Sequence, residues 1–109
     1  MIPRALFAAT GGFDESYFLY CEDVDLSWQA RAHGFALRTC PRALFLHNVR
    51  DRGADPKILH FIYSSGLIMA RKWGDKKFET WLTDHLVHNK LPVPDIHPTP
   101  VPEIGRAHV

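Results

Sequence analysis

The sequence predicts an α/β fold in which helices form most of the domain and a few short strands complete it. Three stretches, 22–33, 56–73 and 77–90, carry the apolar spacing or the start and stop residues of helices. Two shorter apolar stretches, 35–40 and 43–47, have the composition of strands. The 109 residues of the chain suffice for one small domain and are too few for two independent cores.

The helix expected over 22–33 is defined best at its ends. Acidic residues lead it, Arg31 and His33 lie near its end, and Gly34 stands where a left-handed residue commonly terminates a helix. Apolar side chains fall on two opposite sides of this segment when it is drawn as a helix. We therefore expect this helix to be largely buried.

Two further helices are expected, over 56–73 and 77–90. Pro56 suits the first turn of the earlier one, because proline lacks the N–H that an initial turn leaves unpaired, and Gly74 is a natural stop. In both segments apolar side chains recur every three or four residues. This spacing predicts one apolar face on each helix.

The two expected strands, 35–40 and 43–47, are separated by Pro41, which cannot donate to a sheet ladder and favours a turn. After residue 90 the composition changes, since five prolines occur by residue 102 without an apolar pattern. We therefore divide the chain into a folded part, 1–90, and a proline-rich tail, 91–109, that is extended or disordered.

Composition and charge limit the functions to consider. The net charge of +1 gives no basic surface of the kind that binds nucleic acid. The two cysteines, Cys21 and Cys40, are too few for a disulfide framework or a zinc cluster, which favours a reducing compartment. No apolar run reaches the ~18 residues that a membrane-spanning helix requires. We expect a cytoplasmic protein; its oligomeric state does not follow from the sequence.

The helix over 56–73 leaves one alternative open for localisation. A core-packed helix with a solvated basic end is the favoured interpretation. Docking on the inner face of the membrane, as a peripheral protein, is the alternative. The basic residues that this docking would use are Arg71, Lys72, Lys76 and Lys77.

Three carboxylates, Glu22, Asp23 and Asp25, stand inside an otherwise apolar and aromatic stretch. The helix dipole stabilises acids in the first turn of a helix by ~0.3–1 kcal/mol each. One interpretation is therefore that these three acids serve only to stabilise the helix. One acid satisfies a dipole, however, whereas three beside aromatic residues indicate a helix N-terminus that opens into a cleft. A carboxylate there could act as a general base or hold a divalent cation.

His47 ends the apolar run that starts at Ala43, which is where a side chain leaves a strand to enter a site. A lone histidine is more often structural than a ligand. The sequence around His47 leaves both interpretations open.

Taken together, these segments form a family pattern. Residues Gly11 to Phe35 read GGFDESYFLYCEDVDLSWQARAHGF, and Cys40 to His47 read CPRALFLH. This ordered combination resembles the C-terminal half of bacterial family 2 glycosyltransferases, in particular the rhamnosyltransferase-like branch. The resemblance covers residues 1–74. It implies part of a GT-A fold, and an activity that transfers a sugar from a nucleotide-sugar donor to a glycan or lipid-linked acceptor with inversion, with Mg²⁺ or Mn²⁺ in the complete enzyme.

The resemblance also implies a role for each candidate residue. Asp23 would be the general base that deprotonates the acceptor hydroxyl, and His47 would help hold the cation at the donor diphosphate. The acceptor pocket would be lined by Asp14, Glu15, Glu22 and Asp25.

Two departures from the family pattern change what we expect of this chain. The N-terminal nucleotide-binding half with its Asp-x-Asp motif is absent, so we expect the chain alone to lack activity. Relatives often carry an Arg-Asn pair where this chain has Ser64-Ser65-Gly66, which weakens any contact of that helix with donor phosphate. The alternative function is a non-catalytic module, derived from the same fold, that binds a glycan or a protein partner.

Overall fold

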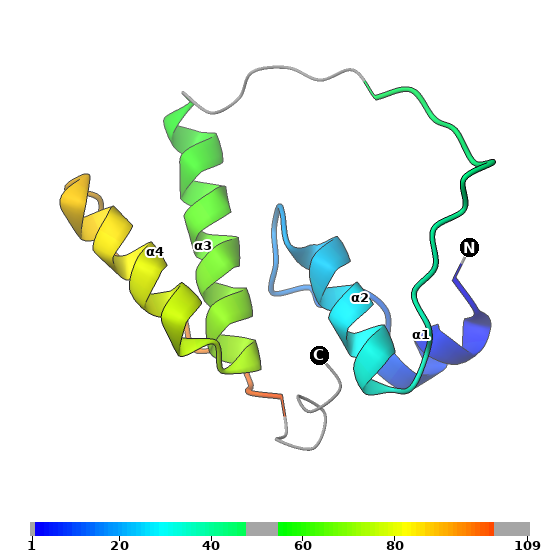
Figure 1. Cartoon of the computed structure of the whole chain (residues 1–109). Coiled ribbons are helices and arrows are strands. Elements are labelled where there is room, and N and C mark those ends of the chain that lie inside the picture. The colour runs from blue at the N-terminus through cyan, green and yellow to red at the C-terminus, as the bar shows by residue number, and fades with distance from the viewer. Residues whose placement is uncertain (1, 48–54, 102–109) are drawn as a thin grey trace.

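The computed structural model describes residues 2–47 and 55–101. The helices are α1 (Arg4–Thr10), α2 (Glu22–Ala32), α3 (Pro56–Trp73) and α4 (Lys76–His88). In Figure 1, α3 lies between α4 on one side and α2 on the other, and α1 lies beyond α2. The predicted helices over 22–33, 56–73 and 77–90 are confirmed, with bounds that differ by two residues at most.

The ends of α3 and α4 show why these residues form helices. The side chain of Asp55 accepts a hydrogen bond from the backbone N–H of Lys57, 2.9 Å away, directly before Pro56. Gly74 ends α3 with a left-handed φ of 69°, and Asp75 then caps α4 by accepting from the N–H of Phe78 at 3.0 Å. The two helices are thus joined by a turn that itself starts the second helix.

Helices α3 and α4 pack against each other through a small apolar core. The buried residues of this core are Leu67, Ala70, Leu82 and Leu86. Gly66 allows the close approach, because a Cβ built at this position would lie 3.0 Å from Cδ1 of Leu82. A side chain at position 66 would therefore require the side chain of Leu82 to shift.

The opposite side of α3 packs against α2 and the loop that precedes it. Tyr17 from the loop joins Ile68, Met69 and Trp73 of α3 in a second buried cluster. Trp28 of α2 meets Trp73 edge to face, with ring centroids 5.5 Å apart, a favourable geometry for two aromatic rings. Helix α3 is therefore the central element that fixes the position of α2.

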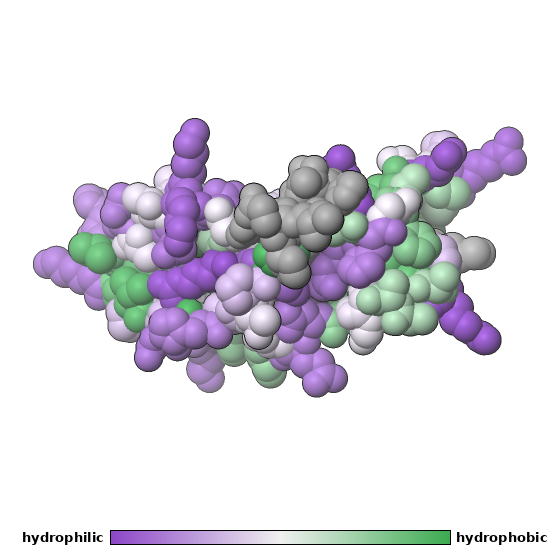
Figure 2. Space-filling model, turned by 90° about the horizontal axis from the view of Figure 1, so that it is seen from below, coloured by the Kyte–Doolittle hydropathy of each residue, from purple (hydrophilic) through white to green (hydrophobic). Residues whose placement is uncertain are grey.

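The described residues contain no strand, so the predicted α/β class is wrong for this part of the chain. Residues 35–40 and 43–47, expected as strands, run without regular structure, and Leu44 and Leu46 are 93% and 100% exposed. A strand needs a neighbouring strand to pair its N–H and C=O groups, and the described residues offer none. Figure 2 shows the apolar surface at the end of the molecule where these residues and α1 lie.

Beyond α4 the chain turns back along α3. The guanidinium of Arg71 donates to the carbonyl oxygen of Ile96 at 2.7 Å, and the N–H of Val101 donates to the carbonyl oxygen of Lys72 at 2.8 Å. Residues 91–101 of the predicted proline-rich tail are thus held at several points against α3, and 102–109 lie outside the described residues.

Candidate functional site

The acidic stretch begins with an unusual backbone turn. Tyr20 and Cys21 both adopt left-handed conformations, with φ of 71° and 67°, which is rare for residues other than glycine. The loop before them is tied to α3, because the hydroxyl of Ser65 donates to the carbonyl oxygen of Leu19. Such strained positions persist where surrounding contacts enforce them, and they cluster at functional sites. This turn sets the start of α2 at Glu22.

Asp25 is enclosed in the core, with an exposed fraction of 0%. Its Oδ1 accepts from the hydroxyl of Tyr17 at 3.1 Å and from Nε1 of Trp73 at 2.7 Å. Its Oδ2 accepts from Nε2 of Gln29 at 2.7 Å and from Nζ of Lys72 at 2.9 Å. A carboxylate has about four acceptor positions, and all four are used here. The structure therefore places Asp25 at the junction of the loop, α2 and α3.

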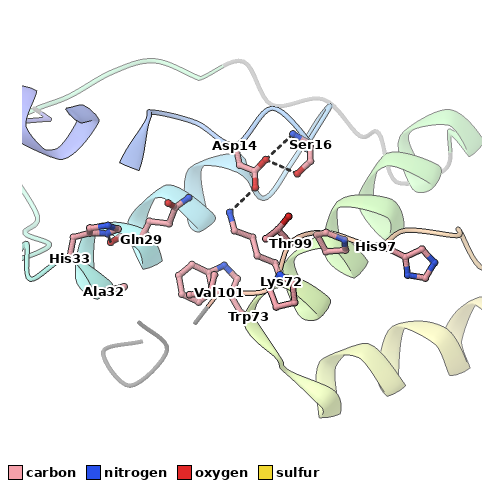
Figure 3. A pocket seen from close by; sticks show the side chains of 12 residues that line it. Asp14, Ser16, Gln29, Ala32, His33, Lys72, Trp73, His97, Thr99 and Val101 are labelled. Atoms are coloured by element: carbon pink, nitrogen blue, oxygen red, sulfur yellow. Dashed lines mark hydrogen bonds and ion pairs between the residues drawn. The ribbon is translucent and has the colours of Figure 1, made fainter. Parts of the chain in front are cut away.

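Lys72 connects Asp25 to a second acid. Its Nζ also lies 2.7 Å from Oδ2 of Asp14, whose Oδ1 accepts from the N–H and the hydroxyl of Ser16 at 2.9 and 2.6 Å (Figure 3). Partial burial acts to raise the pKa of Asp14, but the hydrogen bonds from Lys72 and Ser16 outweigh it and lower that pKa. Asp14 and Asp25, both predicted to line an acceptor pocket, thus share one ammonium group.

Tyr17 and Cys21 are held in their neutral forms by the same surroundings. Burial and the neighbouring charge of Asp25 raise the pKa of Tyr17 far above its usual value, so its hydroxyl remains a donor to Asp25. Burial and the charges of Asp23 and Glu22 raise the pKa of the Cys21 thiol. Cys21 is therefore a poor nucleophile.

Sequence reasoning missed Tyr17, Lys72 and Trp73 as members of this site. The signal that could have found Lys72 is its place beside Trp73, on the helix face that carries the apolar residues of α3. A lysine buried on an apolar face needs an acidic partner. The same burial removes Lys72 from the basic surface that was the alternative basis for membrane docking. In the described residues no helix combines the length and apolar character needed to cross a bilayer.

Asp23 lies in the same first turn of α2 as Asp25 but differs from it in burial and in hydrogen-bond partners. It is exposed in the first turn of α2, and its Oδ1 accepts from the N–H of Val24 at 2.9 Å. Glu22 is half-buried, and its Oε2 is enclosed without a hydrogen-bond partner among the described residues. Glu15 is exposed on the preceding loop. The structure therefore brings Asp14 and Asp25 together and leaves Asp23 and Glu15 open to solvent.

His47 stands apart from these acids. It is exposed and faces the ring of Phe45, with centroids 6.1 Å apart, and no hydrogen bond joins it to the acidic stretch. Within residues 2–47 and 55–101, no group of three or more histidines, cysteines or acids is arranged to hold a metal ion. A divalent cation would need further ligands beside His47.

Comparison with known proteins locates one relationship. No family model matches the chain, and no solved structure matches it. Over 57 residues, 51% of this chain, it is 40% identical to N-acetylglucosaminyl-diphospho-decaprenol L-rhamnosyltransferase of two Mycobacterium tuberculosis strains, CDC 1551 / Oshkosh and ATCC 25618 / H37Rv. The match spans 19% of the length of these relatives. The chain therefore contains a glycosyltransferase-related region.

Proposed function

We propose that this chain supplies the general base and the acceptor side of a rhamnosyltransferase-like family 2 glycosyltransferase. Such an enzyme transfers a sugar from a nucleotide-sugar donor to a glycan or lipid-linked acceptor with inversion. The acidic motif and the rhamnosyltransferase match support this proposal. The relative's name specifies a diphospho-decaprenol acceptor, which makes a lipid-linked acceptor the first class to test.

The observation that carries the proposal is that Asp23 is exposed whereas Asp25 is buried and fully hydrogen-bonded. A general base must reach a substrate hydroxyl, and Asp25 cannot, because it is enclosed and all its acceptor positions are used. Asp23, two residues earlier, is exposed at a helix N-terminus. The buried network holds α2 in place, and Asp23 is the acid that this placement leaves open to a substrate.

In the proposed reaction, Asp23 accepts the proton of the acceptor hydroxyl. The acceptor oxygen then forms a bond to the anomeric carbon of the donor sugar, on the face opposite the bond that breaks. The nucleoside diphosphate leaves with the electron pair of that bond, so the configuration inverts. On the family resemblance alone, we also propose that the complete enzyme uses a divalent cation and that His47 helps to hold it.

The test compares Asp23→Asn with the parent sequence in a polypeptide that joins this chain to the nucleotide-sugar-binding part of a rhamnosyltransferase. We expect the turnover number to fall about 10²–10⁴-fold, which is the usual contribution of a positioned general base. Asp84→Asn, which removes an exposed carboxylate from α4, is the matched control and should leave turnover unchanged. Equal turnover by folded Asp23→Asn and parent proteins would refute the assignment of Asp23.

A non-catalytic glycan-binding module is the second candidate. A cavity whose lining does not include Asp23 favours this candidate, because a glycan could bind there without the proposed general base. Incubating the 109-residue chain alone with nucleotide sugars and Mn²⁺ measures whether this chain binds or hydrolyses a sugar donor. We expect neither donor binding nor donor hydrolysis, and either result would contradict the expectation that this chain lacks a nucleotide site.

A further inference from the structure

A cavity of about 730 Å³ lies between α2, α3 and the segment that follows α4. Its volume falls within the range of about 300–1,000 Å³ that small-molecule sites occupy. Polar side chains in its lining include those of Asp14, Ser16, Gln29, His33, Lys72 and Thr99. Figure 3 shows Gln29 and His33 reaching the cavity from α2, and Thr99 on the side of the C-terminal segment.

The polar groups around this cavity are mainly acceptors. Gln29 donates its Nε2 hydrogen to Asp25, which leaves the amide oxygen as an acceptor. Nδ1 of His33 lies 2.8 Å from the backbone oxygen of Gln29, so in the neutral ring Nδ1 carries the hydrogen and Nε2 accepts. Ser16 donates its hydroxyl hydrogen to Asp14, and its oxygen can still accept. The matching ligand is one that offers several hydroxyl hydrogens.

The charges at the cavity narrow the choice further. One ammonium, that of Lys72, stands against the carboxylates of Asp14 and Asp25, which it contacts at 2.7 and 2.9 Å. One positive and two negative charges leave this group of three side chains negative, so it repels a phosphate or diphosphate group. The ammonium in turn opposes a metal ion at the same place. A neutral polyol is the ligand class that matches both the hydrogen-bonding groups and the charges of the cavity.

We propose that this cavity is a binding subsite for a neutral sugar residue of a glycan. Residues two apart on a helix point about 160° away from each other, so the side of α2 that bears Asp25 and Gln29 is opposite the side of Asp23. The sugar held here is therefore not the one whose hydroxyl Asp23 would deprotonate. The subsite holds a more distant sugar unit of the acceptor. That the sugar belongs to an acceptor rests on the proposed function, whereas the binding of a sugar in this cavity does not.

The experiment titrates the ¹⁵N-labelled 109-residue chain with the methyl glycosides of N-acetylglucosamine and L-rhamnose, and separately with inorganic pyrophosphate. The resonances to follow are the side-chain amide of Gln29 and the indole N–H of Trp73, which both donate to Asp25 beside the cavity. Thr99→Val removes one exposed hydroxyl from the cavity wall. Thr80→Val removes an exposed hydroxyl from α4, outside the cavity wall, and is its matched control.

We expect saturable shifts at Gln29 and Trp73 with at least one glycoside and none with pyrophosphate. The loss of one hydrogen bond in Thr99→Val should weaken binding about fivefold, and Thr80→Val should leave it unchanged. The proposal is overturned if neither glycoside produces saturable shifts, if pyrophosphate shifts these resonances, or if both variants bind alike. This titration measures binding without turnover, so a failure of this subsite is distinguishable from a failure of the Asp23 assignment, which the turnover of Asp23→Asn tests separately.

Discussion

Replacing Asp25 by asparagine tests whether the buried network holds this fold together. The substitution keeps the volume of the side chain and removes its charge. Four donors converge on the Asp25 carboxylate, and an asparagine amide presents one oxygen and one NH₂ group to them. One pair of donors must therefore face the hydrogens of the amide. Lys72 loses one of its two carboxylate partners at the same time.

The expected cost follows from these contacts. Hydrogen bonds to charged groups contribute about 1.5–3 kcal/mol, and breaking a buried ion pair on one side costs about 3–5 kcal/mol. Because Lys72 keeps Asp14 as a partner, we expect the lower part of this range, about 3 kcal/mol. A domain of this size is stable by only about 5–15 kcal/mol. The melting temperature should therefore fall by about 12–24 °C.

The assay is thermal and urea unfolding of the 109-residue chain at pH 7, followed by circular dichroism. Asp23→Asn is the matched control, because it makes the same chemical change two residues away on the exposed side of α2. It removes only an interaction with the helix dipole, about 0.3–1 kcal/mol. Equal losses of unfolding free energy in the two variants, or a loss below about 1 kcal/mol for Asp25→Asn, would refute the assignment of a structural role to Asp25.

Two further predictions concern Asp14 and the α3–α4 core. The pKa of Asp14 is lowered in the folded state, so its ionised form stabilises the fold above the unfolded value near 3.8, and this contribution is lost as pH falls through the lower folded value. Urea unfolding across this range should show a shallower acid-side loss of stability in Asp14→Asn than in the parent chain; identical slopes would contradict this. Leu82→Ala should cost about 2–5 kcal/mol in urea unfolding, since Leu82 is buried between α3 and α4. Val87→Ala, at an exposed position of α4, should cost less than about 0.5 kcal/mol, and a comparable loss there would argue against this packing.

The helices could be predicted because their signals are local. Pro56 and Gly74 bound α3 at the predicted positions, and Gly34 follows α2 by two residues, with a left-handed φ of 83°. Capping and backbone conformation depend on residues within a few positions of each other, so the sequence contains them in full. For the same reason, α4 lies within two residues of its predicted bounds.

The strands could not be predicted in the same way. Residues 43–47 have the composition of a strand, yet Leu44 and Leu46 are almost fully exposed. Strand formation depends on a pairing partner that is distant along the chain, and composition does not reveal whether one is present. The described residues provide no such partner, and the α/β prediction failed for that reason.

By itself, the sequence determined the three long helices and the three acids at the start of α2, and it showed the resemblance from which we propose a role for these acids in sugar transfer. Only the tertiary structure decided that these acids differ. Asp25 is enclosed by donors from the loop and α3, whereas Asp23 faces solvent. The burial and charge pairing of Asp25 arise from contacts with residues that are distant in the sequence: Lys72, 47 positions away, and Trp73, 48 positions away. No local pattern encodes such contacts, because folding alone brings these residues together.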